Sequence, residues 1–79
     1  MKNHSVGIIK KIKIVGKWTE IWVSDQEHYD ASFKTYMLDR VISKKGYDYE
    51  ILMNGYNYLI GMVLVFDERC DPSDLVCRV

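Results

Sequence analysis

Hydrophobic and polar residues alternate along residues 6–25, VGIIKKIKIVGKWTEIWVSD, and the alternation breaks at Gly16-Lys17. A glycine at the first central position is what a two-residue type II′ turn requires, and residues typical of strands flank it on both sides. The sequence therefore predicts a β-hairpin. The cross-strand pairs, counted outward from the turn, are Val15 with Trp18, Ile14 with Thr19, Lys13 with Glu20, Ile12 with Ile21, Lys11 with Trp22, and Lys10 with Val23.

The two faces of this hairpin differ in chemistry, because successive side chains of a strand point to opposite sides. One face is aliphatic and predicts a core contact; it carries Ile8, Ile12, Ile14, Ile21 and Val23. The other face is basic and aromatic; it carries Ile9, Lys11, Lys13, Val15, Trp18, Glu20 and Trp22. A slip of one residue in the register would place lysines among the isoleucines.

A helix is predicted from about Asp25 to Lys45. Ser24 and Glu27 have the spacing of a capping box, and Lys44, Lys45 and Gly46 mark a helix end. Asp30 is an alternative first residue, with Asp25 to Tyr29 as a loop. The apolar stripe of this helix at helical spacing is Phe33, Met37, Leu38, Val41 and Ile42, with Tyr29 and Tyr36 on its border.

Residues 47–66 predict a second hairpin, since Asn54-Gly55 is the strongest short-range signal for a type I′ turn. Leu52 and Leu59 then share the reverse face of this hairpin. The apolar run of residues 62–66 predicts a strand in the middle of a sheet, paired also with the first strand.

The tail predicts a short helical turn through Cys77, with Asp71 as cap, Pro72 in the first helical position and Asp74 near the positive helix end. Such a helix would place Cys70 roughly 10 Å from Cys77, too far for the ~5.5 Å between the α-carbons of a disulfide. Free thiols are expected in a reducing compartment, and an irregular tail would leave a bridge open.

These elements assemble into an α+β fold with a four-stranded, mostly antiparallel sheet (ββαββ), one helix on one face and a short C-terminal helical turn. A chain of 79 residues is expected to form a single domain, 1–79. The second face of the sheet has no helix to cover it. The candidate partner-binding residues on that uncovered face are Lys11, Lys13, Trp18, Glu20, Trp22 and Leu59.

The formal net charge is zero, but residues 1–45 hold nine Lys or Arg against five acids, and residues 46–79 hold two against six. Such a dipolar protein has no overall attraction to nucleic acid or membrane. Lysines interrupt the apolar N-terminal run, which matches neither a secretory signal nor a membrane span. We expect a cytoplasmic protein with no membrane insertion.

Residues for catalysis or metal binding gather most densely at Asp25, Glu27, His28 and Asp30, which also suits a polar helix N-terminus. His4 is simplest as a solvated tail residue. The acids Asp67, Glu68, Asp71 and Asp74 lack EF-hand spacing, the cysteines do not form CxxC, and there is no glycine-rich phosphate loop. The sequence favours a protein that is not an enzyme and has no cofactor or metal, with a site near His28 as the alternative.

Binding to single-stranded nucleic acid is one function that the basic and aromatic hairpin can serve. Lysines can follow phosphates while indoles stack on bases. The residues for this role are Lys10, Lys11, Lys13, Lys17, Trp18 and Trp22. Glu20 and the acidic second half oppose a continuous basic groove.

Protein recognition is the function that the sequence favours, because exposed Trp and Tyr are preferred anchors of interfaces. The partner would be a homodimer mate, a foreign protein, or both. The chain is short, rich in aromatic residues on one face and without a catalytic motif. In this general character it resembles the small accessory proteins that bacteriophages make to bind and redirect a host protein, which implies an inhibitor or modulator of such a protein.

Overall fold

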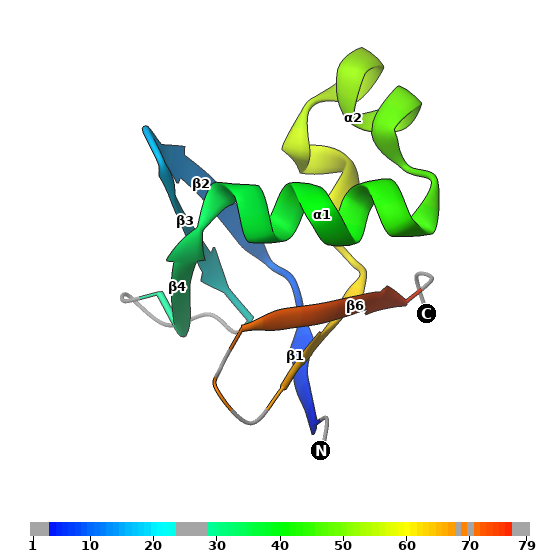
Figure 1. Ribbon diagram of the computed structural model, residues 1–79. Coiled ribbons are helices and arrows are strands. Elements are labelled where there is room, and N and C mark those ends of the chain that lie inside the picture. Colours follow the sequence, from blue (N-terminus) through cyan, green and yellow to red (C-terminus); the bar gives the residue numbers. More distant parts are fainter. Residues whose placement is uncertain (1–3, 24–28, 68, 70, 77–79) are drawn as a thin grey trace.

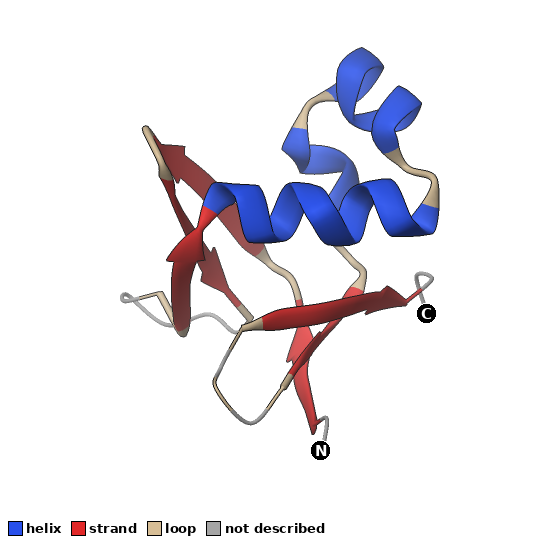
Figure 2. Ribbon diagram, viewed as in Figure 1, coloured by secondary structure: helices blue, strands red, loops and turns tan. Residues whose placement is uncertain are grey.

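The protein folds into two antiparallel sheets of three strands each, crossed by one long helix (Figures 1 and 2). The computed structural model describes residues 4–23, 29–67, 69 and 71–76. In chain order the elements are β1 (His4–Ile8), β2 (Lys11–Val15), β3 (Trp18–Trp22), β4 (Ala31–Lys34), α1 (Thr35–Lys45), α2 (Asp48–Asn54), the 3₁₀ helix η1 (Tyr56–Leu59), β5 (Val63–Phe66) and β6 (Pro72–Val76).

The prediction of one four-stranded ββαββ sheet is wrong, although the fold is α+β. The sheets have the orders β1-β5-β6 and β2-β3-β4. The predicted first strand divides at Ile9 and Lys10, and each residue bonds to a different part of the fold. The N–H of Ile9 donates to the carbonyl of Met62 at 2.9 Å, and that of Lys10 donates to Trp22 at 2.7 Å. One continuous segment therefore serves both sheets.

The first hairpin is confirmed in its register, from Val15 opposite Trp18 to Lys11 opposite Trp22. Gly16 has a φ of +59°, which glycine adopts without strain. Ile21 is buried as expected, and Thr19 joins it on that face. Ile9, predicted on the basic face, is fully buried, because it lies in the break between β1 and β2 where the alternation stops.

The predicted helix start is wrong, because residues 31–34 form strand β4 and α1 begins only at Thr35. Ala31 and Phe33 are buried, whereas Ser32 and Lys34 are exposed, which is the two-residue period of a strand. Asp30 is not a helix cap; its Oδ2 accepts the N–H of Val23 at 2.9 Å. The predicted capping box, Ser24 to Glu27, lies outside the described residues.

The end of α1 is confirmed at Lys45, followed by Gly46 in the left-handed region at φ +79°. The amide of Gly46 donates to Ser43, and that of Tyr47 donates to Ile42, so two carbonyls of the last turn are satisfied.

The second predicted hairpin is wrong: residues 48–54 form α2 and residues 56–59 form η1. Gly55 has the positive φ, +73°, that the turn required, but here it ends a helix, and its N–H donates to the carbonyl of Ile51 at 2.7 Å. Tyr47 and Ile51, one helical turn apart, pack on the core.

Strand β5 lies in the middle of its sheet and pairs with β1, as the sequence predicted for residues 62–66. The predicted helical turn in the tail is wrong, because residues 72–76 form β6. Pro72 is the first residue of this edge strand, a position that needs no backbone donor. Cys70 and Cys77 lie outside the described residues.

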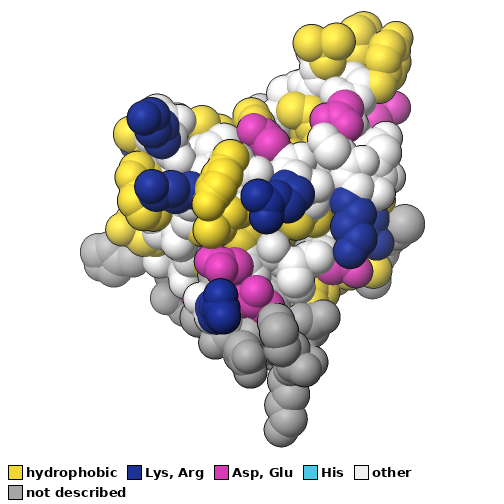
Figure 3. Space-filling view, viewed as in Figure 1, with side chains coloured by type: hydrophobic (Ala, Val, Ile, Leu, Met, Phe, Trp, Pro, Cys, Tyr) yellow, Lys and Arg dark blue, Asp and Glu magenta, His cyan; other side chains and the backbone are white. Residues whose placement is uncertain are grey.

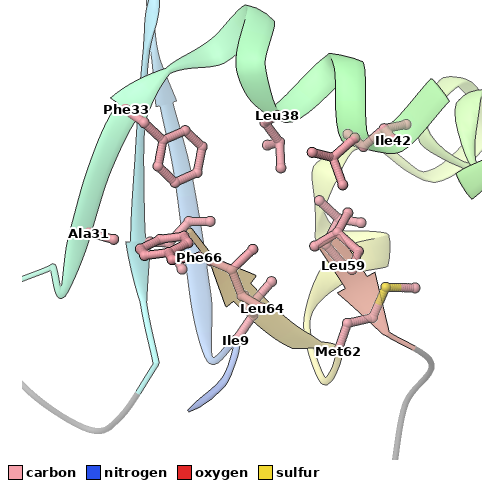
Figure 4. Close-up of a cluster of buried hydrophobic side chains, with 12 residues drawn as sticks. Ile9, Ala31, Phe33, Leu38, Ile42, Leu59, Met62, Leu64 and Phe66 are labelled. Atoms are coloured by element: carbon pink, nitrogen blue, oxygen red, sulfur yellow. The ribbon is translucent and has the colours of Figure 1, made fainter. Parts of the chain in front are cut away.

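The core fills the space between the sheets, α1 and η1 (Figure 4). Its buried members are Ile9, Ile21, Ala31, Phe33, Leu38, Val41, Ile42, Leu59, Met62, Leu64, Phe66 and Leu75. Polar contacts at both ends of α1 help to hold it in place. The hydroxyls of Thr19 and Thr35 are 2.9 Å apart, and Lys45 Nζ lies 2.7 Å from Asp74 Oδ1 on β6.

Candidate binding surface

Three elements bring exposed aromatic and basic side chains together at one end of α1. Strand β3 pairs with β4 so that Trp18 is opposite Lys34, and the N–H of Thr35 donates to the carbonyl of Lys17 at 2.8 Å. Tyr36 lies in the first turn of α1, and Arg40 lies one turn later on the same face of the helix. We call the resulting set the aromatic–basic surface; its members are Lys17, Trp18, Lys34, Tyr36 and Arg40.

Each exposed ring of the aromatic–basic surface has a cation beside it. Trp18 is 49% exposed and Tyr36 is 51% exposed. Lys34 Nζ lies 5.7 Å from the indole centroid, and Arg40 Cζ lies 5.5 Å from the phenol centroid. A cation–π contact at an exposed site contributes about 0.5–1 kcal/mol, enough to favour one side-chain arrangement without removing the charge from solvent.

The surface is hollowed on two sides of Lys34 and Tyr36, which line both hollows. The first, of about 300 Å³, is lined by Gly16, Lys17, Lys34, Thr35, Tyr36 and Asp39. The second, of about 350 Å³, is lined by Trp18, Ser32, Phe33, Lys34, Tyr36, Met37, Arg69 and Asp71. Figure 3 shows hydrophobic and basic side chains side by side across this face of the molecule. The surface thus offers a binding partner both hollows and positive charge.

An acid at the edge of the surface already has an internal partner. Asp39 Oδ1 accepts the phenolic O–H of Tyr56 at 2.6 Å. Burial of the phenol, together with this hydrogen bond and the nearby carboxylate, raises the pKa of Tyr56 to about 12. Asp39 is therefore engaged with the η1 segment, and the three cations of the aromatic–basic surface outnumber the acids that line its hollows, Asp39 and Asp71.

The sequence-predicted site residues separate into different environments. Lys10, Lys11, Lys13 and Lys17 are exposed, and Glu20 is half-buried opposite Lys13. Of these, Lys17 belongs to the aromatic–basic surface.

The two tryptophans of the hairpin do not form one exposed face. Trp22 is only 9% exposed; its ring meets Tyr29 edge to face at 5.8 Å, and Lys11 Nζ lies 4.6 Å from its centroid. Trp22 therefore packs against its neighbours, whereas Trp18 is open to a partner.

Leu59, predicted on the uncovered face, is fully buried and its side chain points into the core (Figure 4). The prediction failed because it depended on the second hairpin. In η1, Leu59 lies among the buried side chains of the core instead of in solvent.

Sequence reasoning missed Lys34, Tyr36 and Arg40, since it placed residue 34 inside a helix and had no strand to bring it beside Trp18. The signal that was available is the alternation of Ala31, Ser32, Phe33 and Lys34.

Two acids of the second half, Asp67 and Asp74, make contacts within the fold. Asp67 Oδ1 accepts the amides of Arg69 and Asp71 and so shapes the β5–β6 loop. The hydrogen bond from Lys45 is the main cause of a lowered pKa at Asp74. Within the described part of the chain, no three His, Cys, Asp or Glu side chains gather as a metal site would require. Asp25, Glu27 and His28 lie outside it.

Comparison of the chain with protein-family models, with curated proteins and with solved structures finds no match. Among the described residues, no helix is long and apolar enough to cross a membrane.

Proposed function

We propose that the protein acts by binding another protein through the aromatic–basic surface. The observation that carries this proposal is the pair of half-exposed rings, Trp18 and Tyr36, each beside a cation and next to a hollow. Trp, Tyr and Arg are the residues most enriched among those that dominate interface energies, and they act best where a pocket lies beside them.

The chemistry of the surface supports a particular composition of the partner segment. Lys17, Lys34 and Arg40 favour carboxylates, and the apolar walls of the hollows favour aliphatic or aromatic side chains. The partner segment would therefore combine acids with apolar residues. We place this binding in the cytoplasm. In keeping with the general character of phage accessory proteins, we propose that the partner is a host protein whose activity is inhibited or redirected.

The test is a Trp18→Ala, Tyr36→Ala double variant, used after affinity capture from the source cell has identified a partner. Each ring, as an interface anchor, accounts for about 2 kcal/mol or more, so affinity should fall by at least about 30-fold per ring while the fold persists. Tyr29→Ala is the matched control, since Tyr29 is an aromatic residue outside the surface and its exposed fraction of 47% is close to that of Trp18 and Tyr36. Unchanged affinity of the double variant would refute the proposal.

Binding of single-stranded nucleic acid is the second candidate, favoured by exposed rings next to cations and by the exposed lysines of the hairpin, Lys10, Lys11 and Lys13. Fluorescence anisotropy with single-stranded oligonucleotides at low salt tests it. Binding by this mode must weaken steeply with added salt as phosphate contacts are lost. No salt-dependent binding would remove this candidate.

A further inference from the structure

Helix α2 exposes its most hydrophobic face. Tyr49 is 67%, Leu52 is 81% and Met53 is 64% exposed. These residues are spaced i, i+3 and i+4, so they form one continuous stripe, and Ile51 on the opposite side packs on the core. Hydrophobic side chains gathered on one exposed face mark an interaction site in a small protein. We call these three residues the α2 stripe.

Carboxylates border the α2 stripe on both sides. At 3.6 residues per turn, Asp48 lies next to Leu52 on one edge, and Glu50 lies beyond Met53 on the other. Ser43 Oγ donates to Asp48 at 2.9 Å, and Asn54 Nδ2 donates to Glu50 at 3.2 Å, so both acids are held at the helix. A surface that receives the stripe must therefore combine apolar contacts with basic side chains.

The aromatic–basic surface has this complementary chemistry. We propose that the α2 stripe of one copy of the protein docks on the aromatic–basic surface of a second copy. Carboxylates of α2 would meet Lys17, Lys34 and Arg40, while leucine and methionine side chains would enter the hollows beside Tyr36.

The two surfaces cannot meet within one copy. The aromatic–basic surface lies where β4 enters α1, and α2 follows the other end of α1 (Figure 1). Figure 3 shows hydrophobic side chains gathered at the upper right, where Figure 1 places α2, well away from the basic and hydrophobic side chains near the start of α1. A contact between copies is then head to tail. Such a contact builds either a closed ring or an open chain with one stripe and one surface free at its ends.

This inference rests on the proposed function in one respect, since the same surface serves both contacts. Self-association would cover the site for a foreign partner. Partner binding would then compete with assembly, and the available sites per copy would fall as the protein concentration rises.

Sedimentation velocity over a range of concentrations, up to about 1 mM, tests the proposal with two complementary variants. One variant, Leu52→Ala with Met53→Ala, removes the stripe at exposed positions and keeps residues that favour a helix. The other, Lys34→Glu with Arg40→Glu, reverses the charge of the surface at exposed positions. Circular dichroism confirms that each variant is folded.

The mean mass of the wild-type protein should rise with concentration and fall with added salt, and each variant alone should remain monomeric. An equimolar mixture of the variants should form a one-to-one dimer that grows no further, because it contains one intact stripe and one intact surface.

A wild-type protein that stays monomeric, a variant that associates as the wild type does, or a mixture that stays monomeric would each overturn the proposal. If the wild-type protein is monomeric and the variant with Leu52→Ala and Met53→Ala loses a foreign partner, the stripe binds that partner and not a second copy.

The outcome for the proposed function is separate. If the Lys34, Arg40 variant loses the foreign partner while the wild type never self-associates, only the self-association falls. If that variant keeps its foreign partner, the proposed function falls and self-association is judged on the mass measurements alone.

Discussion

Leu52 and Leu59 provide a direct test of the fold between residues 47 and 66. They are the same residue type, seven positions apart, yet Leu52 is 81% exposed and Leu59 is fully buried. Truncation of a buried leucine to alanine removes transfer free energy and leaves a cavity, at a cost of about 2–5 kcal/mol. At an exposed helical position the same change costs less than about 0.5 kcal/mol.

The expected effect of Leu59→Ala is large relative to the whole stability of the protein. At ~0.05–0.15 kcal/mol per residue, a chain of 79 residues is stable by roughly 4–12 kcal/mol. Leu59→Ala should therefore remove about a sixth or more of the free energy of unfolding, and lower the melting temperature by about 4–8 °C for each kcal/mol lost. Leu52→Ala should leave both quantities nearly unchanged.

Urea unfolding followed by tryptophan fluorescence measures both variants under the same conditions. If the free energy of unfolding falls with urea concentration at the same slope in both variants, a difference between their midpoints is a difference in stability. A hairpin with its turn at Asn54-Gly55 would place both leucines on one face. Similar losses of stability in the two variants would therefore refute the helical structure of this segment.

Three further predictions concern polar and aromatic contacts. Asp74→Asn should cost up to about 1 kcal/mol near neutral pH, because the partner of Lys45 is lost at a partly exposed site. That stability is complete above the ordinary pKa of 3.8 and disappears as pH falls through the lowered pKa of Asp74; urea unfolding against pH measures it. Spectroscopic titration of phenolate should show a step near pH 12 from Tyr56, which Asp39→Asn shifts to lower pH. Trp22→Ala should cost about 3–5 kcal/mol in urea unfolding, because this tryptophan is buried.

Each of these predictions has a result that would contradict it. A wild type and an Asp74→Asn variant that differ equally at neutral and strongly acidic pH would exclude a charged contact with Lys45. The titration step near pH 12 must be absent in Tyr56→Phe, and its survival there would assign it to another phenol. A Trp22→Ala variant as stable as the wild type would show that this ring is not part of the packed structure.

The sequence correctly predicted the elements whose turn or end is determined by a residue within or directly beside them. Gly16 with Lys17 determines the register of β2 and β3, and Gly46 ends α1 whatever the rest of the chain does. Both are local conformational requirements, and no distant residue competes with them.

The sequence misled where one local signal suits two structures. A glycine with positive φ at position 55 fits a type I′ turn and equally a helix C-terminus. The alternation of Tyr47, Tyr49, Ile51 and Met53 contains the helical spacing of Tyr47 and Ile51 as well. A hairpin with its turn at Asn54-Gly55 would place all four of these residues on one face, whereas the actual helix leaves Tyr49 and Met53 in solvent.

The candidate site was predictable in part. Trp18 and Lys17 follow from the hairpin alone. Lys34 enters the surface only through the pairing of β4 with β3, and Tyr36 and Arg40 enter only because α1 continues directly from β4. These are tertiary relationships, which periodicity within a single segment does not encode.

The division of the first strand at Ile9 and Lys10 has a consequence for the order of folding. The β2–β3 hairpin closes over a two-residue turn, whereas β1 must wait for β5, more than fifty residues later in the chain. Non-local pairing is slower, because its loop entropy is lost before any contact compensates for it. During synthesis, the part of the segment after Lys10 can acquire structure early, while β1 has no partner strand until residues 63–66 have emerged. In that interval both edges of the segment before Ile9 are open to pairing with another chain, which is a route to aggregation.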